Sequence, residues 1–230
     1  MWIIIDKRIA DASKKVLSSL GNLLELESSG IVYDAISGHP DIFSCQADDH
    51  LIMAPNTPES FVAQLEKSKI GFEFGTRPLG MKYPHTAHYN AVVTEQLLIH
   101  NLDITDPKLL DLCKSKQKIQ VNQAYTRCNL MALDYKIFIT SDKGIEKALV
   151  DLNFNVFYVE PDKIELSGFA HGFFGGCCGV LDKKILLNGS LHGIRNKDSL
   201  QLFAEQAGFS FVELNNGPLC DAGSIFFVAR

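Results

Sequence analysis

Residues 129–158 read NLMALDYKIFITSDKGIEKALVDLNFNVFY, and this stretch holds one complete copy of the unit that decides the fold. Two short apolar runs separated by a polar turn predict a β-hairpin. The next segment, DKGIEKALVDL, places apolar residues at helical spacing: Ile145, Ala148, Leu149 and Leu152. The run NVFYV after it predicts a further strand. The unit is therefore two strands, a helix and a third strand.

The same order of signals recurs along the chain, at 41–74, at 90–121 and at 178–214. A fifth copy is split between the ends: GSIFFVAR (223–230) would pair with WIIID (2–6), followed by the helix RIADASKKVLSSLG and the strand LLEL. The predicted hairpins begin at positions separated by 49, 39, 49 and 44 residues, namely Asp41, Asn90, Asn129, Cys178 and Ala222. Such a fixed period is the signature of a repeat architecture.

The repeat predicts a single α/β domain over 1–230, a five-unit pseudo-symmetric α/β propeller whose last unit is closed by the N- and C-terminal strands. Alternating strands and helices would also suit a three-layer α/β sheet. Against that alternative, no glycine-rich loop follows the first strand, and every unit contains a hairpin.

Helix-boundary signals agree with the repeat. Asp106 before Pro107, and Thr57 before Pro58, are each typical of an N-cap residue and the first helical residue. Gly21 and Gly208 are expected to end two helices. The apolar faces are expected to be Ile9, Ala12, Val16 and Leu20 in the first helix, and Leu200, Phe203, Ala204 and Ala207 in the last.

Composition excludes several classes of function. The net charge of −5 and the absence of a run of Lys or Arg longer than a pair argue against nucleic acid as a partner. No apolar stretch is long enough for a transmembrane helix, and no export signal is visible, so no membrane partner is expected. Six irregularly spaced cysteines favour reduced thiols and a cytoplasmic location. No cofactor is implied, and no ligand pair, including His85 with His88, has strong zinc spacing.

Five stretches that lead into the hairpins should meet near the ring axis, where a small-molecule ligand could bind. They are SGHPDI (37–42), PHTAHYN (84–90), AYTRCN (124–129), HGFFGGCCG (171–179) and NNGPLCDAGS (215–224). Four of the seven histidines and four of the six cysteines lie in them. Loops on a rigid scaffold commonly carry function, although Gly, Pro and Asn here could simply form turns.

The segments GHPDI, YTRCN, ITSDKGI, GFFGGCCGVLD and GPLCDAGSIFF resemble those of an uncharacterised bacterial family with the guanidine-group-modifying enzyme fold. The resemblance covers nearly the whole chain. It implies a five-unit α/β propeller, the fold of arginine deiminases, amidinotransferases and dimethylarginine hydrolases. In those enzymes a cysteine of the last unit attacks the guanidinium carbon, a histidine of the middle unit acts as acid and base, and carboxylates bind the cation.

Carried over to this sequence, the resemblance implies Cys220 as the nucleophile, although a different register places Gly223 there. Cys177 is the second nucleophile candidate. The middle-unit histidine is replaced by Tyr125 or Thr126, so His39, His88 or His171 would have to act instead, and His39 is the catalytic candidate. The expected substrate-binding residues are Asp41, Asn90, Arg127 and Asp221. A planar, hard-to-deprotonate guanidinium requires this set of thiolate, carboxylates and proton donor.

Three functional hypotheses follow. The first is a cysteine-dependent hydrolase or transferase acting on a small guanidino or amidino compound. The second is a protein that binds a cationic, arginine-like small molecule and has lost catalysis with the missing histidine. The third is a structural protein whose centre is filled by side chains such as Phe173 and Phe174. The pair Gly175 and Gly176 is expected to allow close backbone packing at the axis, since no P-loop lysine follows it.

Overall fold

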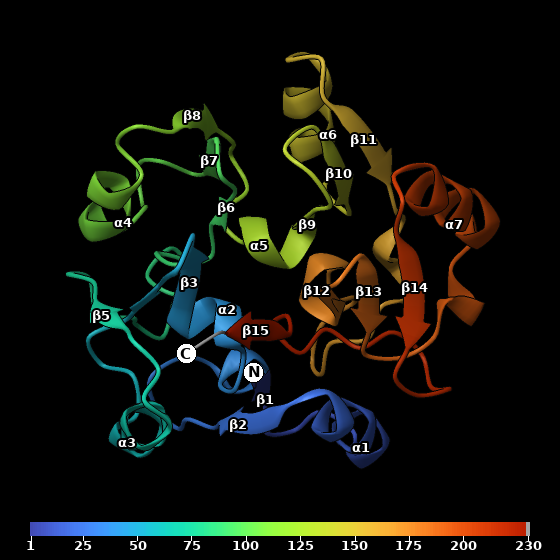
Figure 1. Ribbon diagram of the computed structural model, residues 1–230. Helices are drawn as coiled ribbons and strands as arrows, with labels where there is room; N and C mark the ends of the chain where they lie inside the picture. Colours follow the sequence, from blue (N-terminus) through green and yellow to red (C-terminus); the bar gives the residue numbers. More distant parts are fainter. Residues whose placement is uncertain (229–230) are drawn as a thin grey trace.

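The structure is a computed structural model that describes residues 1–228, and it consists of five three-stranded sheets arranged around a common centre (Figure 1). The sheets are formed by β15 (Phe226–Val228), β1 (Trp2–Asp6) and β2 (Asn22–Leu26); β3 (Ser44–Ala47), β4 (His50–Met53) and β5 (Glu73–Phe74); β6 (Val92–Val93), β7 (Leu97–His100) and β8 (Gln117–Gln120); β9 (Leu130–Ala132), β10 (Ile137–Thr140) and β11 (Asn155–Tyr158); β12 (Cys178–Leu181), β13 (Lys184–Leu187) and β14 (Ser210–Glu213). The predicted five units and the α/β class are confirmed.

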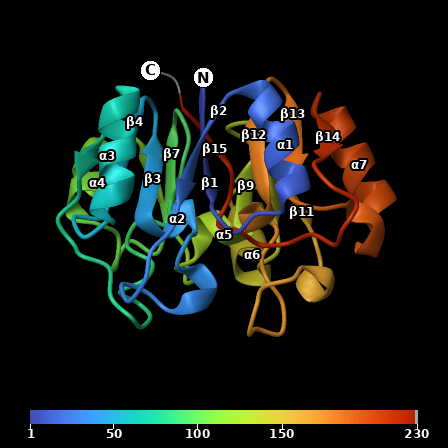
Figure 2. The same cartoon turned by 90° about the horizontal axis from the view of Figure 1, so that it is seen from below.

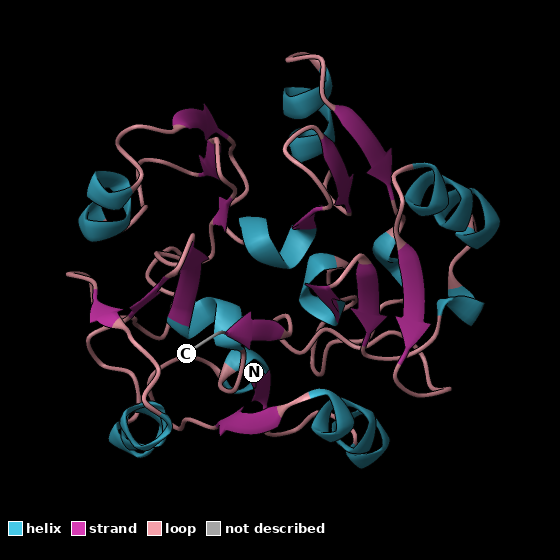
Figure 3. Ribbon diagram, viewed as in Figure 1, coloured by secondary structure: helices cyan, strands magenta, loops and turns pink. Residues whose placement is uncertain are grey.

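Every sheet has the same connectivity. An inner strand pairs antiparallel with the middle strand, and after a helix the outer strand pairs parallel with it. The helices of the five units are α1 (Asp11–Leu20), α3 (Glu59–Ser68), α4 (Pro107–Leu112), α6 (Lys143–Val150) and α7 (Lys197–Gln206). Figure 3 shows α1, α3, α4 and α7 at the rim, while two four-residue helices, α2 (Pro40–Phe43) and α5 (Thr126–Asn129), lie at the centre.

The two ends of the chain complete one sheet, as predicted. β1 pairs antiparallel with β15, with Trp2 opposite Val228 and Ile4 opposite Phe226. Ala229 and Arg230, the last two residues of the predicted terminal strand, lie outside the described residues. Figure 2 shows the start of β1 and the end of β15 at the same face of the molecule.

Burial explains why the middle strands are nearly continuous apolar runs. In β1, β4, β7, β10 and β13 at most one residue per strand is not buried, and each of these strands lies between an inner and an outer strand of its sheet. The outer strand β11 contains no fully buried residue. Among residues 1–228, no helix combines the length and the apolar character needed to span a membrane.

The predictions for the face of α1, the start of α3 and the role of Asp41 are wrong in detail. The buried residues of α1 are Ser13 and Leu17, and Ile9 is buried just before the helix as predicted, whereas Ala12, Val16 and Leu20 are exposed. Spacing alone could not select this face, because it depends on a hydrogen bond from Ser13 Oγ to Asn188 Oδ1 of another unit (3.1 Å).

The other two concern helix starts. α3 begins at Glu59 with Pro58 as its N-cap, because the Thr57 hydroxyl donates to the Ala54 carbonyl (2.8 Å) instead of capping the helix. Asp41 lies in α2 and does not begin a strand. The Asp106 cap is confirmed, since its side chain accepts from Lys108 N. Gly208 follows α7 with φ +80°, as expected for a helix-ending glycine.

Candidate functional site

A cavity of about 390 Å³ lies where the middle strands β1 and β13 end. We call it the acidic pocket. Its wall combines the end of β1, the segments after β13 and β14, and the chain between Cys220 and Ala222 that leads into β15. Its ionisable lining residues are Asp6, Arg8, His39, Glu165, Cys220 and Asp221. These come from segments up to 215 residues apart, which the ring brings together.

His39 lies between two buried carboxylates. Its Nδ1 is 3.8 Å from Asp221 Oδ1, and its Nε2 is 4.0 Å from Asp6 Oδ2. The ring is 1% exposed, and Nδ1 has no hydrogen-bond partner among residues 1–228. A buried polar nitrogen without a partner is costly, and Nδ1 retains a hydrogen-bonding capacity that its neighbours do not use.

The Asp221 carboxylate is held by backbone amides and by close glycine packing. Its oxygens accept from Gly223 N (3.1 Å) and Phe173 N (3.0 Å). Burial raises the pKa of Asp221 to about 6; His39 acts in the opposite direction, and Asp41 adds to the rise. A Cβ atom on Gly176 would lie 2.0 Å from Asp221 Oδ1, which confirms the predicted close packing at this glycine.

Cys220 lies at the edge of the acidic pocket and is partly buried. Its backbone is fixed by hydrogen bonds with Asn188, from Cys220 N to Asn188 O (2.9 Å) and from Asn188 Nδ2 to Cys220 O (3.0 Å). Burial, followed by the charges of Asp221 and Glu165, raises the pKa of the thiol to about 11. In the unliganded protein the sulfur is therefore a protonated thiol at neutral pH.

The guanidinium group of Arg8 covers Asp6. Arg8 Nε donates to both Asp6 oxygens (3.0 and 3.2 Å), and Nη2 donates to Oδ2 (2.5 Å). The side chain of Arg8 is 48% exposed, whereas that of Asp6 is 2% exposed. The protein thus already binds one guanidinium at a buried carboxylate of this pocket, and that guanidinium is its own.

Asp41 and Asn90 lie deeper and do not line the acidic pocket. Asp41 Oδ2 accepts from Ser224 Oγ (2.7 Å) and from Cys128 Sγ (3.2 Å). Asn90 Nδ2 donates to the Asp41 carbonyl (2.9 Å), and Asn90 Oδ1 accepts from Cys128 N (3.1 Å). This buried network joins four units, so both side chains make contacts at the centre of the ring and lie outside the lining of the acidic pocket.

The remaining candidates lie elsewhere. Cys177 is fully buried, and its Sγ donates to the Phe173 carbonyl (3.3 Å), so it does not reach the acidic pocket. Arg127 lines a different cavity. His88 Nδ1 contacts the Ile104 carbonyl (2.7 Å), and His171 Nδ1 the Gly172 carbonyl (3.0 Å); neither lines the acidic pocket.

Tyr125 stands where the resemblance implies a histidine. Its hydroxyl is hydrogen-bonded to Thr86 Oγ1 (2.5 Å) and to Tyr33 Oη (3.2 Å). Together with Phe173 it lines a cavity of only about 20 Å³ that also touches His39 and Asp221. Aromatic side chains therefore fill the centre beside the acidic pocket, but they leave the pocket itself open.

Sequence reasoning missed three groups of the pocket, namely Asp6, Arg8 and Glu165. A signal existed for Asp6, because a carboxylate directly ends the buried run WIII. Arg8 and Glu165 lie in connecting segments whose position depends on the tertiary fold. Within the described chain, no group of three or more His, Cys, Asp or Glu side chains is arranged to hold a metal ion.

The fold is shared with solved structures of guanidine-modifying enzymes. Dimethylarginine dimethylaminohydrolase from Pseudomonas aeruginosa, solved with citrulline, has a TM-score of 0.57 at 9% identity, covering 92% of this chain and 91% of that chain. Agmatine deiminase from C. jejuni has a TM-score of 0.56 at 10% identity (95% and 90% covered). The amidinotransferase of the saxitoxin biosynthetic pathway from Microseira wollei has a TM-score of 0.55 at 9% identity (100% and 94% covered).

At these identities the likeness shows the guanidine-modifying fold alone. A comparison with curated proteins found no match. A family model, described as a family of unknown function (DUF6873), matches residues 4–226. The chain therefore belongs to this family, and it has the fold of the guanidine-modifying enzymes.

Proposed function

We propose that the acidic pocket binds a small cationic guanidino or amidino compound and that Cys220 attacks its central carbon, as in a cysteine-dependent hydrolase or transferase. The observation that carries the proposal is the arrangement of Asp6, Asp221 and Glu165 around a cavity that also contains a thiol and an imidazole. Paired carboxylates are the natural ligands of a planar cation.

A bound cation would supply the activation that the thiol lacks in the unliganded protein. The negative charges of Asp221 and Glu165 raise the pKa of Cys220. A guanidinium held by these carboxylates would offset their charge and lower the pKa of the thiol, so that the thiolate forms when substrate is present. His39 is the nearest imidazole to Asp221 and is the proposed proton acceptor and donor.

In the proposed reaction, the thiolate forms an S–C bond to the guanidinium carbon, and the C–N bond to the leaving amine breaks as that nitrogen takes a proton from His39. Water then attacks the same carbon and gives one proton to His39, and the C–S bond breaks to release the Cys220 thiolate, which gives a ureido product from a guanidino substrate. In a transferase, an acceptor amine would replace the sulfur instead.

We further propose that the five sheets form an α/β propeller with the acidic pocket at its axis. The six free thiols favour a reducing, cytoplasmic location.

A second function, binding without catalysis, is favoured by one observation. Tyr125, in the place implied for the histidine, is hydrogen-bonded to Tyr33 and Thr86 and offers no imidazole. The same pocket would then hold a cationic ligand without converting it.

Labelling with 2-chloroacetamidine tests the proposal, because this reagent combines an amidinium with an electrophilic carbon. Mass mapping should locate the label on Cys220, formed at least about tenfold faster than with neutral chloroacetamide. Cys220→Ser should abolish the label, and Cys177→Ser, which removes a buried thiol, should leave it unchanged. Equal rates for the two reagents, or no label on Cys220, would refute the proposal. Binding of guanidino compounds without any ureido product would establish the second function.

A further inference from the structure

A second cavity, of about 190 Å³, lies at the other end of the inner strands; we call it the Arg127 cavity. All five inner strands contribute to its lining, through Gln46, Val93, Met131, Val180 and Phe227 among others. Phe227 lies opposite Ile3 near the start of β1, whereas Asp6 of the acidic pocket ends that strand. The two cavities are therefore at opposite ends of the ring.

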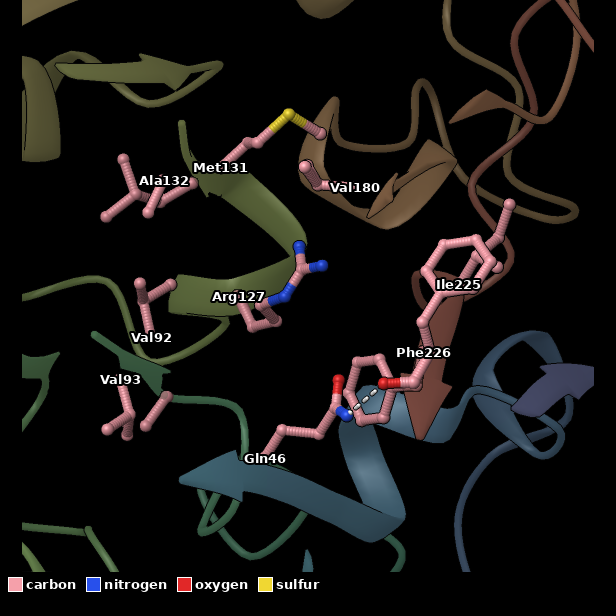
Figure 4. Close-up of a pocket in the computed structure, with 12 residues that line it drawn as sticks. Gln46, Val92, Val93, Arg127, Met131, Ala132, Val180, Ile225 and Phe226 are labelled. Atoms are coloured by element: carbon pink, nitrogen blue, oxygen red, sulfur yellow. Dashed lines mark hydrogen bonds between the residues drawn. The ribbon is translucent and has the colours of Figure 1, made fainter. Parts of the chain in front are cut away.

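Arg127 is the one charged side chain among the described residues that line this cavity. Figure 4 shows its guanidinium with Met131 and Val180 on one side of it and Gln46 and Phe226 on the other. Nη1 donates to the Gly175 carbonyl (3.2 Å), and the guanidinium carbon is 5.8 Å from the centre of the Phe226 ring. Within residues 1–228, no carboxylate oxygen lies within 4.0 Å of Arg127.

The guanidinium of Arg127 is partly buried and makes one hydrogen bond, and no carboxylate among the described residues compensates its positive charge. Arginine has five N–H donors, and the Gly175 carbonyl takes one of those of Arg127, so four remain available for a ligand. Removing such a cation from water without a counter-charge is unfavourable. An oxyanion that accepts two parallel N–H bonds would compensate it best.

The other residues that line the Arg127 cavity indicate the chemical groups that such an anion must have besides its negative charge. Gln46 Nε2 donates to the Phe227 carbonyl (2.9 Å), as Figure 4 shows, which leaves one further N–H of that amide for a ligand. Beyond Arg127 and Gln46, the side chains are apolar, including Val92, Val93, Met131 and Val180. A small anion with a short apolar body fits this combination better than a fully hydrated inorganic ion.

We infer that the Arg127 cavity is a second ligand site, which binds a small organic monocarboxylate through the guanidinium of Arg127. The carboxylate accepts from Arg127 and Gln46, and a branched or short aliphatic chain packs against the inner-strand valines. The site is independent of the acidic pocket and of any reaction at Cys220.

Titration calorimetry with isovalerate tests this inference, with neutral isovaleramide as the matched probe. The wild-type protein should bind isovalerate saturably and bind isovaleramide at least about tenfold more weakly. Arg127→Met should lose at least about tenfold in affinity. Arg195→Met, which removes an exposed arginine paired with Asp162, should bind isovalerate as the wild type does.

A measurement on the wild-type protein guards against a folding defect in the Arg127→Met variant. In ¹⁵N-labelled protein, isovalerate should shift the guanidinium Nε–H resonance of Arg127 with the same saturation curve as the calorimetry. No saturable binding of isovalerate, equal binding of the amide, or an unmoved Arg127 resonance would overturn the inference. Unchanged labelling of Cys220 in Arg127→Met would show that the two sites are separate.

Discussion

At the scale of single residues, Asp221 combines a raised pKa with a place in the lining of the acidic pocket. Its pKa is raised from 3.8 to about 6, chiefly by burial. Because the folded state holds this proton more tightly than the unfolded chain, the stabilisation is complete below about pH 4 and is lost as the pH rises through about 6.

Asp221→Asn should remove this pH dependence. Between about pH 4 and pH 7, the free energy of unfolding of the wild type should fall by up to about 3 kcal/mol relative to that of the variant. Urea unfolding of both proteins across this range measures the difference. Parallel curves would show that Asp221 does not titrate as its burial requires.

The contact between Arg8 and Asp6 predicts competition with ligand. A guanidino compound that uses Asp6 must displace the Arg8 guanidinium, which makes three hydrogen bonds to this carboxylate. The Arg8 backbone N–H makes a fourth. Arg8→Met should therefore raise the affinity for methylguanidinium by about tenfold, whereas Arg8→Lys should change it less. Calorimetry measures both; weaker binding by Arg8→Met would mean that Arg8 contacts the ligand instead.

At this scale, the candidate site residues and the loops that carry them could be predicted from the sequence, but the residues that they contact could not. Cys220, His39 and Asp221 come together at the acidic pocket from stretches that the sequence singled out. Asp41 and Asn90 lie in equivalent stretches, yet they point into the buried network. The direction of a side chain at the axis depends on contacts between units, which no local pattern contains.

At the scale of elements, the helix-capping residues Asp106 and Asp142 should contribute unequally to the free energy of unfolding. Asp106 accepts from Lys108 N at the start of α4 and also from Thr76 N, Arg77 N and the Tyr89 hydroxyl. Asp142 accepts from Ile145 N at the start of α6 and from Gln123 Nε2. Truncating Asp106 therefore leaves more buried donors without a partner.

We expect Asp106→Ala to lower the free energy of unfolding by about 3 kcal/mol, and Asp142→Ala by about 1 kcal/mol. Chemical denaturation of both variants tests this order. A larger loss for Asp142→Ala would contradict the view that Asp106 anchors the loop after β5 as well as the helix.

Element type could be predicted from the sequence because helical spacing and strand runs are local. The face of α7, with Leu200 and Ala204 buried, follows its spacing. The face of α1 does not, since Ser13 is buried by its hydrogen bond to Asn188 while Val16 is exposed. Periodicity cannot identify a polar residue that is buried because it hydrogen-bonds to a residue far away in the sequence.

At the scale of the whole molecule, the pairing of β1 with β15 predicts tolerance to circular permutation. Trp2 lies opposite Val228, so a short linker can connect the segment after Val228 to the segment before Trp2. New ends can be opened at Asp134–Lys136, an exposed turn between β9 and β10. The permuted chain should fold with a free energy of unfolding within about 2 kcal/mol of the wild type.

Circular dichroism and urea unfolding measure this, and a permutant opened within β10 serves as the control that should not fold. Failure of the chain opened at 134–136 would indicate that the order of the units, and not only their ring, is required.

The central claim is that the acidic pocket binds a guanidinium cation through carboxylates that include Asp221. Calorimetric titration with methylguanidinium at about pH 7.5 and about pH 5 tests it most directly, with neutral methylurea as control. Saturable binding at the higher pH should weaken about tenfold at the lower pH, as Asp221 gains its proton near pH 6, and methylurea should not bind. Absence of binding at the higher pH, or binding of equal strength for methylurea, would contradict the claim.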